Sequence, residues 1–184
     1  MGLHQSELIG LLREGIDSQG GEWADLGAGE GAFTLALAEL LGPGAHINAV
    51  DRDGGALRRL AEEMGRRYPA TKFDVRVADF RRPLPLAGLD GVVMANSLHF
   101  LRDKRDVVAS VHAMLRPGGR LIVVEYGADR GNPWVPHPFS YPRWETMAAD
   151  AGFEGTRLLG TVPSRYLGSM YSAVTFVPLP TRAG

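Results

Sequence analysis

Apolar and polar residues follow two periods along this chain, one typical of helices and the other of strands. Leu8, Leu11, Leu12 and Ile16 recur at helical spacing with charged residues between them, which predicts an amphipathic helix at the start. Short apolar runs bounded by glycine or proline predict strands. We expect helices at residues 3–16, 33–41, 54–68, 103–115 and 143–151, and strands at 22–26, 46–50, 72–77, 89–95, 120–125, 153–160 and 170–177.

Strand and helix alternate through the first two-thirds of this order. Parallel strands need helical crossovers, so the alternation predicts an α/β fold with a doubly wound, Rossmann-like, mostly parallel seven-stranded sheet. About ten residues without a helical pattern join the last two strands, which predicts an antiparallel pair at the C-terminal edge. With 184 residues, 45% of them hydrophobic, the chain suits a single domain.

A glycine-rich segment, DLGAGEG from Asp25 to Gly31, follows the first predicted strand directly. Its three alternate glycines allow a tight turn with exposed backbone, and the following helix adds free amide groups. Ligands of doubly wound sheets bind beyond the carboxyl ends of the strands, so we expect a ligand at this loop. Gly27, Gly29 and Ala32 also satisfy the dinucleotide pattern G-x-G-x-x-G/A, so the ligand could be a dinucleotide or a different ribose-containing molecule. Asp51 is a plausible partner for the ribose hydroxyls of both kinds of ligand.

Asp25 distinguishes a dinucleotide from a ligand without phosphate groups. A carboxylate two residues before the first glycine would repel a pyrophosphate, whereas it suits a ligand with a sulfonium and an ammonium group. Glu30, inside the loop, indicates the same preference. The other interpretation of Asp25 is a solvated residue at the end of a strand.

Asp25 to Gly31 resembles the E/D-x-G-x-G-x-G signature of class I S-adenosylmethionine-dependent methyltransferases. The resemblance extends over nearly the whole chain, toward the small-molecule group that includes the quinone-biosynthesis enzymes. It implies S-adenosylmethionine as the cofactor. The cofactor-binding residues that it implies are Asp25, Gly27, Ala28, Gly29, Gly31, Asp51, Arg52, Asp79, Phe80 and Asn96.

The resemblance also implies roles for several of these residues. Asp51, which follows the second strand, would hold both ribose hydroxyls, and Arg52 would flank the adenine. Asp79 would accept from the adenine amine and Phe80 would lie against the ring, although Asp79 is also interpretable as a turn cap. The backbone carbonyl near Asn96 would accept from the cofactor ammonium.

Methyl transfer needs a base only when the acceptor loses a proton. His99, just past the fourth strand, is the candidate base; alternatively it packs against the cofactor or caps a turn. Glu125 and Tyr126 are expected to face the cleft. The single domain, 1–184, then divides into an N-terminal helix (1–20), a cofactor-binding core (21–125) and a C-terminal part (126–184). This last part begins with an aromatic, proline-rich stretch, 126–142, which we expect to be an acceptor lid.

Composition excludes several kinds of chemistry. The chain has no cysteine, which removes disulfides, thiolate metal sites and cysteine nucleophiles, and we expect no metal. Its net charge of −1 gives no general attraction to nucleic acid, so we expect none as a partner. Without a long apolar run or a visible signal segment, we expect a cytoplasmic protein that binds no membrane. The expected partner is a small organic acceptor, with the chain as a monomer or homodimer.

Three other functions stay open at this point. A nicotinamide-dependent oxidoreductase is disfavoured, because neither Tyr126 nor Tyr141 is followed by a lysine four residues later. A non-catalytic scaffold that only binds the cofactor would keep the same loop. A protein or RNA methyltransferase that needs a partner for recognition would keep it as well.

Overall fold

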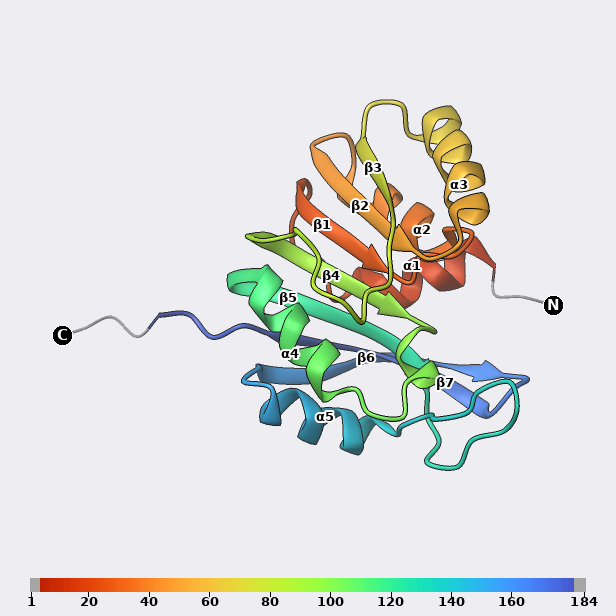
Figure 1. Ribbon diagram of the computed structural model, residues 1–184, viewed down its shortest axis with the longest axis vertical. Helices are drawn as coiled ribbons and strands as arrows, with labels where there is room; N and C mark the ends of the chain where they lie inside the picture. The colour runs from red at the N-terminus through yellow and green to blue at the C-terminus, as the bar shows by residue number, and fades with distance from the viewer. Residues whose placement is uncertain (1–3, 181–184) are drawn as a thin grey trace.

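A seven-stranded mixed sheet runs through the molecule in the order β3-β2-β1-β4-β5-β7-β6 (Figure 1). This computed structural model describes residues 4–180. Strands β1 to β5 pair in parallel, and β7 pairs antiparallel with both β5 and β6, which confirms the predicted fold and its C-terminal pair. The strands are β1 (Gly21–Leu26), β2 (Ala45–Asp51), β3 (Lys72–Val77), β4 (Leu89–Ala95), β5 (Leu115–Tyr126), β6 (Glu154–Ser164) and β7 (Gly168–Phe176).

Helices cover both faces of the sheet, as the buried strands require (Figure 1). Successive strand residues point to opposite faces, so Trp23 packs with the helices of one face and Ala24 with those of the other. Among the described residues, no helix is long and apolar enough to cross a membrane. The first face carries α1 (Gln5–Arg13), α2 (Ala32–Leu41) and α3 (Gly54–Arg67), and the second carries α4 (Arg105–Met114) and α5 (Tyr141–Asp150), with a short 3-10 turn, η1 (Leu98–Phe100), after β4.

The strand order reverses at β1, which has β2 on one side and β4 on the other. The crossovers from these two neighbours leave in opposite directions, which opens a crevice at the carboxyl ends of β1 and β4. The glycine loop follows β1 and begins α2, so it lies at this crevice.

Several elements differ from their predicted bounds. The first helix ends at Arg13 rather than residue 16, and at Gly15 the chain lies so close to the core that an added Cβ would be 2.8 Å from Ile122 Cδ1. Leu3 lies outside the described residues. Strand β5 begins at Leu115 rather than residue 120, since Leu115 already pairs with Leu89 of β4.

The last two strands are longer than predicted. Pairing continues to Ser164 opposite Gly168, so three residues join the strands instead of about ten. Pro163 lies inside β6, and the edge position of that strand tolerates its missing amide hydrogen.

Candidate functional site

The glycine loop depends on backbone geometry that side chains would disturb. Gly27, Gly29 and Gly31 all have positive φ, at 86°, 53° and 84°. An added Cβ at Gly27 would lie 2.7 Å from Ser97 Cβ, and one at Gly31 would meet Leu60, whereas one at Gly29 would meet nothing within 4 Å. The loop therefore packs tightly at its two ends and leaves open space beside its middle glycine.

Asp51 links this loop to the start of α3. Its Oδ2 accepts from the amide of Gly29 and its Oδ1 from the amide of Asp53, both at 2.8 Å. Asp53 in turn caps α3 by accepting from the amides of Gly55 and Ala56. Each carboxylate oxygen of Asp51 keeps a second lone pair, so it can still accept from a diol in the crevice.

Asp25 lies beneath the loop and is only 1% exposed. Burial raises the pKa of its carboxyl to about 6; the hydroxyl of Thr34, which donates to Oδ2 at 2.6 Å, opposes this rise, and the negative charge of Asp51 adds to it. The group is therefore mostly ionised at neutral pH and favours a nearby cation. Glu30 lines the cleft beside Gly31 and pairs with Arg59 at 2.8 Å.

Two cavities of about 230 Å³ each lie over the carboxyl ends of β1, β2 and β4. Both are lined by Gly27 and Asn96, so they lie side by side, and together they are called the cleft below. The predicted cofactor residues converge here: the first cavity has Asp51, Arg52, Asp79 and Phe80, and the second has Asp25, Ala28 and Gly31. Gly29 lines neither cavity and contributes through its amide bond to Asp51.

Asp79 and Phe80 form the wall opposite Gly27. The Nε of Arg81 donates to both carboxylate oxygens of Asp79 at 2.9 Å, and this pairing lowers the pKa of Asp79 to about 2. Phe80 Cε1 lies 3.3 Å from where a Cβ on Gly27 would be. The carboxylate stays ionised and shares its acceptor capacity between Arg81 and the cavity.

Asn96 lies at the centre of the site. Of residues 4–180, it is the one non-glycine residue with positive φ, at 53°, and such strain concentrates at functional positions. Its Oδ1 is buried without a hydrogen-bond donor among the described residues. A buried acceptor without a partner is costly, and a ligand donor in the cleft that Asn96 lines would supply one.

Glu125 is fully buried and holds the turn that follows β4. Its Oε1 accepts from the amides of Ser97, Leu98 and His99 at 3.1, 2.8 and 3.3 Å, and its Oε2 lies 2.8 Å from His99 Nδ1. Because a carboxylate only accepts, Nδ1 carries the hydrogen of this bond, so Nε2 is the ring nitrogen that can accept a proton. The sequence placed Glu125 facing the cleft, and instead it lies beneath His99.

A third cavity, of about 540 Å³, adjoins the cleft at Asn96. Its walls come from α1, α2, the end of β5 and the β6–β7 hairpin, and include Phe33, Tyr126, Arg165 and Tyr166. Of the stretch predicted as a lid, 126–142, Tyr126 alone lines it. His99 lines none of the three cavities: it is 3% exposed, and its ring packs against Tyr126 with centroids 5.2 Å apart.

The aromatic residues of the predicted lid and of the helix that follows it do not gather around the acceptor cavity. Phe139 and the following Trp144 are buried in the core between α4, α5 and the sheet, whereas Trp134 is 73% exposed. Within residues 4–180, no group of three or more histidine or acidic side chains could hold a metal ion.

The residues present fit the cofactor that the motif implies. The open side of Gly29, the free lone pairs of Asp51 and the unpartnered Oδ1 of Asn96 offer space, a diol acceptor and an ammonium acceptor along one cleft. The ionised Asp25 supplies negative charge at the same end as Asn96.

The chain is similar to known methyltransferase sequences. The profile of a methyltransferase domain family matches residues 24–121. The chain is 35% identical over 125 residues to a carboxy-S-adenosyl-L-methionine synthase of Chromohalobacter salexigens, across 64% of this chain and 44% of that protein. It is 29% identical over 120 residues to an O-methyltransferase of Penicillium expansum, across 65% and 43%. The chain thus spans less than half the length of these relatives.

Solved structures show the same fold. A SAM-dependent methyltransferase from Methanosarcina mazei matches with a TM-score of 0.71 at 18% identity, across 97% of this chain and all of that one. A phosphoethanolamine N-methyltransferase from Haemonchus contortus, solved with S-adenosylhomocysteine, matches with a TM-score of 0.76 at 14% identity, across 95% and 52%. The family profile covers more than half of this chain, so the chain belongs to the methyltransferase domain family, and its fold is that of class I S-adenosylmethionine-dependent methyltransferases.

Proposed function

We propose that this enzyme methylates a small organic acceptor that binds in the cavity of about 540 Å³ beside the cofactor cleft. The observation that carries the proposal is the position of Asn96, which lines this cavity and both halves of the cleft. Two ligands bound in these spaces meet at the carboxyl end of β4. The cavity has a volume typical of sites for small molecules.

In this proposal, different cleft residues bind different parts of the cofactor. Asp51 holds the ribose hydroxyls, and Asp79, Phe80 and Arg52 surround the adenine. Asn96 and Asp25 lie at the methionine end, with the backbone of Gly27 to Gly31 beneath the ligand. Their arrangement in two adjoining cavities supports this order.

When bound, the cofactor supplies a methyl group on a sulfonium, which is an electrophile. The protein's main contribution is to hold the acceptor atom in line with that methyl, and Phe33 and Tyr126 provide the walls that do so. His99 is the proposed base for acceptors that must lose a proton. Glu125 fixes its tautomer and leaves Nε2 free to take the proton, and the ring lies one side chain away from the cavity, against Tyr126.

The walls of the acceptor cavity favour an aromatic or otherwise apolar acceptor that carries an acidic group. Phe33, Tyr126 and Tyr166 offer ring surfaces, and Arg165 places a guanidinium among them. Arg165 donates to the hydroxyl of Tyr166 at 2.7 Å and has no carboxylate partner among the described residues. The names of an O-methyltransferase and a phosphoethanolamine N-methyltransferase among the similar proteins also support a small acceptor.

The test is turnover with a panel of phenols, amines and carbon acids, with and without a carboxylate substituent. S-adenosylhomocysteine release and the mass of the product are both measured. We expect product with at least one class, and a loss of at least about a hundredfold in kcat for His99→Ala on an acceptor that must be deprotonated. His137→Ala is the control, because that exposed side chain lines neither the cleft nor the acceptor cavity.

Two outcomes would contradict the proposal. Cofactor binding without product from any class would support the non-catalytic scaffold instead. Turnover of His99→Ala within about threefold of the parent enzyme would remove His99 as the base, since a general base contributes far more.

A further inference from the structure

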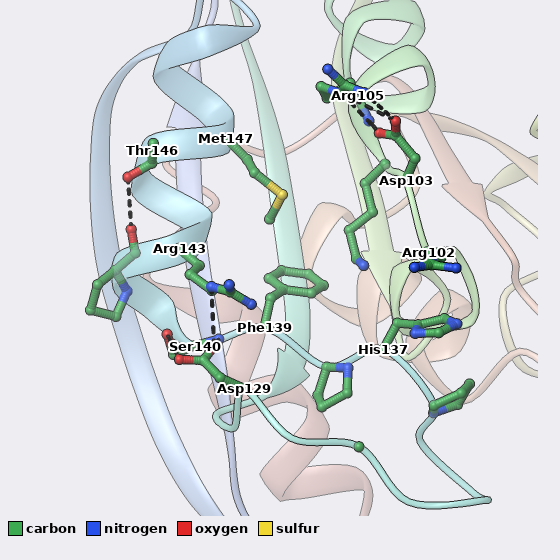
Figure 2. Close-up of a pocket in the computed structure, with 15 residues that line it drawn as sticks. Arg102, Asp103, Arg105, Asp129, His137, Phe139, Ser140, Arg143, Thr146 and Met147 are labelled. Carbon is green, nitrogen blue, oxygen red and sulfur yellow. Dashed lines mark hydrogen bonds and ion pairs between the residues drawn. The ribbon is translucent and has the colours of Figure 1, made fainter.

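A second large groove, of about 870 Å³, lies between the N-terminal ends of α4 and α5 (Figure 2). Its walls come from residues 102–105, from the irregular stretch 129–140 and from the first turns of α5. It shares no lining residue with the three cavities of the cofactor and acceptor site. Methyl transfer as proposed above leaves this groove unused.

The groove is positively charged although the whole chain has a net charge of −1. Four basic side chains and two carboxylates line it, which leaves two positive charges in excess. Both carboxylates already have partners: Asp103 accepts from Arg105, and Asp129 accepts from the amide and hydroxyl of Ser140. Among residues 4–180, Arg102 forms no ion pair.

Lys104 is the most unusual of these groups, because it is only 6% exposed. Its Nζ donates to the carbonyl of Leu101 at 2.7 Å and lies 5.0 Å from the ring centre of Phe139. Burial lowers its pKa, the charge of Glu125 opposes this, the charge of Arg143 lowers it further, and Asp103 opposes it weakly. No carboxylate in the described residues pairs with Lys104 directly, and a buried ammonium with spare donors and no anion in contact is costly, so its presence needs an explanation.

Arg102 and Arg143 lie on opposite sides of the groove (Figure 2), whereas Arg105 is paired with Asp103. In Figure 2, Arg102 lies beside His137 on one side of the groove, and Arg143 lies on the other, with its guanidinium group directed toward Phe139 between them. Arg143 has only a loose contact with Asp129, at 3.7 Å, so its guanidinium keeps donors for a ligand.

We propose that this groove binds a phosphorylated small molecule, with the phosphate held by Arg102, Lys104 and Arg143. A phosphate monoester carries up to two negative charges at neutral pH, which matches the excess charge of the groove. Arginine guanidinium groups present paired donors that suit phosphate oxygens. The groove is much larger than a phosphate group, so the organic part of the ligand lies along Met147 and the prolines of the 129–140 stretch.

The test is equilibrium binding of phenyl phosphate to the full chain by isothermal titration calorimetry, with phenol and benzoate as matched ligands. We expect saturable binding of phenyl phosphate at millimolar concentration or below, no binding of phenol and weaker binding of benzoate. Arg102→Ala and Arg143→Ala each raise the Kd at least about tenfold, and both positions are exposed, so these variants are expected to fold. Lys104→Met keeps the bulk and removes the charge, and it weakens binding to a similar extent.

Arg130→Ala is the control, because Arg130 is exposed in the same stretch and does not line the groove. Its affinity for phenyl phosphate stays unchanged. Saturating S-adenosylhomocysteine does not compete. The proposal is overturned by absence of saturable binding, by equal affinity for benzoate, by parent-like affinity of the Arg102 and Arg143 variants, or by competition from S-adenosylhomocysteine, which would place the ligand in the cofactor cleft.

Discussion

One half of the cofactor cleft lies over β1 and β2 and the other over β4 and β5, and the two halves are built in different ways. Over β1 and β2, the contacts are local or come from the sheet itself: Asp51 ends its strand and accepts from Gly29 and Asp53. Over β4 and β5, the turn 97–99 is held by Glu125, a residue 26 to 28 positions later in the chain. One half uses backbone geometry and a half-buried carboxylate, and the other uses a fully buried charge.

This difference separates ligand binding from folding. Asp51 is partly exposed, so water can replace its bonds when it is removed. Glu125 is fully buried, so its removal leaves several amide donors without an acceptor at a place that water cannot reach. Substitutions over β1 and β2 should therefore change affinity for the cofactor, and those over β5 should change stability and turnover together.

Glu125→Ala is expected to have the largest effect. Three backbone amides and His99 lose their common acceptor, so the free energy of unfolding falls by about 3–5 kcal/mol. Urea denaturation measures this loss. Glu154→Ala, at the exposed start of β6, is the control and changes stability by less than about 0.5 kcal/mol. A loss below about 1 kcal/mol for Glu125→Ala would remove the contrast between the two halves.

Asp51→Ala is expected to weaken S-adenosylhomocysteine binding more than tenfold, which is about 1.4 kcal/mol. The ribose hydroxyls lose their acceptor and Gly29 loses its anchor, while the fold keeps its other contacts. Calorimetric titration measures the Kd, with Asp150→Ala at the exposed end of α5 as the control. Unchanged affinity would show that Asp51 does not hold the ribose.

The raised pKa of Asp25, about 6, gives a pH dependence. The unfolded chain ionises this group at lower pH, so ionisation in the fold costs stability as the pH rises from about 4 through 6. A cationic cofactor prefers the ionised form, so its affinity rises as the pH rises through that same value and levels off above it. Between about pH 5 and pH 7 we expect a rise of up to about tenfold.

Asp25→Asn tests whether Asp25 causes this rise of cofactor affinity with pH. The variant keeps the size of the side chain and removes its titration, so its cofactor affinity is lower at neutral pH and flat between pH 5 and 7. A slope that persists in the variant would assign the titration to another group.

Arg52→Ala is expected to have the smallest effect. Its side chain is exposed at the rim of the cavity and forms no hydrogen bond with the described residues, so cofactor affinity falls by less than about threefold. A loss comparable with that of Asp51→Ala would mean that the adenine half depends on side-chain charge as strongly as the ribose half does.

The same contrast explains what could be predicted from the sequence. The glycine loop and Asp51 follow strands with clear apolar patterns, so their spacing alone placed them at one crevice. The contact of Glu125 with the 97–99 turn leaves no local pattern, because it joins separate strands. The length of the β6–β7 hairpin also depended on cross-strand pairing, which overrode the turn signal of Pro163.

The groove between α4 and α5 was not predicted for a similar reason. Lys104 lies inside the helix predicted at 103–115, Arg102 lies directly before it, and Phe139 lies inside the predicted lid. Only the packing of the 129–140 stretch against the start of α4 brings these residues together.

We propose that the cleft over β1, β2 and β4 binds S-adenosylmethionine through Asp51. The most direct measurement is thermal unfolding of the parent and the Asp51→Ala variant with S-adenosylmethionine, S-adenosylhomocysteine, NAD or NADP. A ligand at 100 times its Kd adds about 2.7 kcal/mol, which raises the Tm by about 5–10 °C for a domain of this size. We predict such a rise in the parent with the two adenosyl-sulfur ligands alone, and a smaller rise in the variant. A rise with NAD or NADP, or none with S-adenosylhomocysteine, would contradict the account.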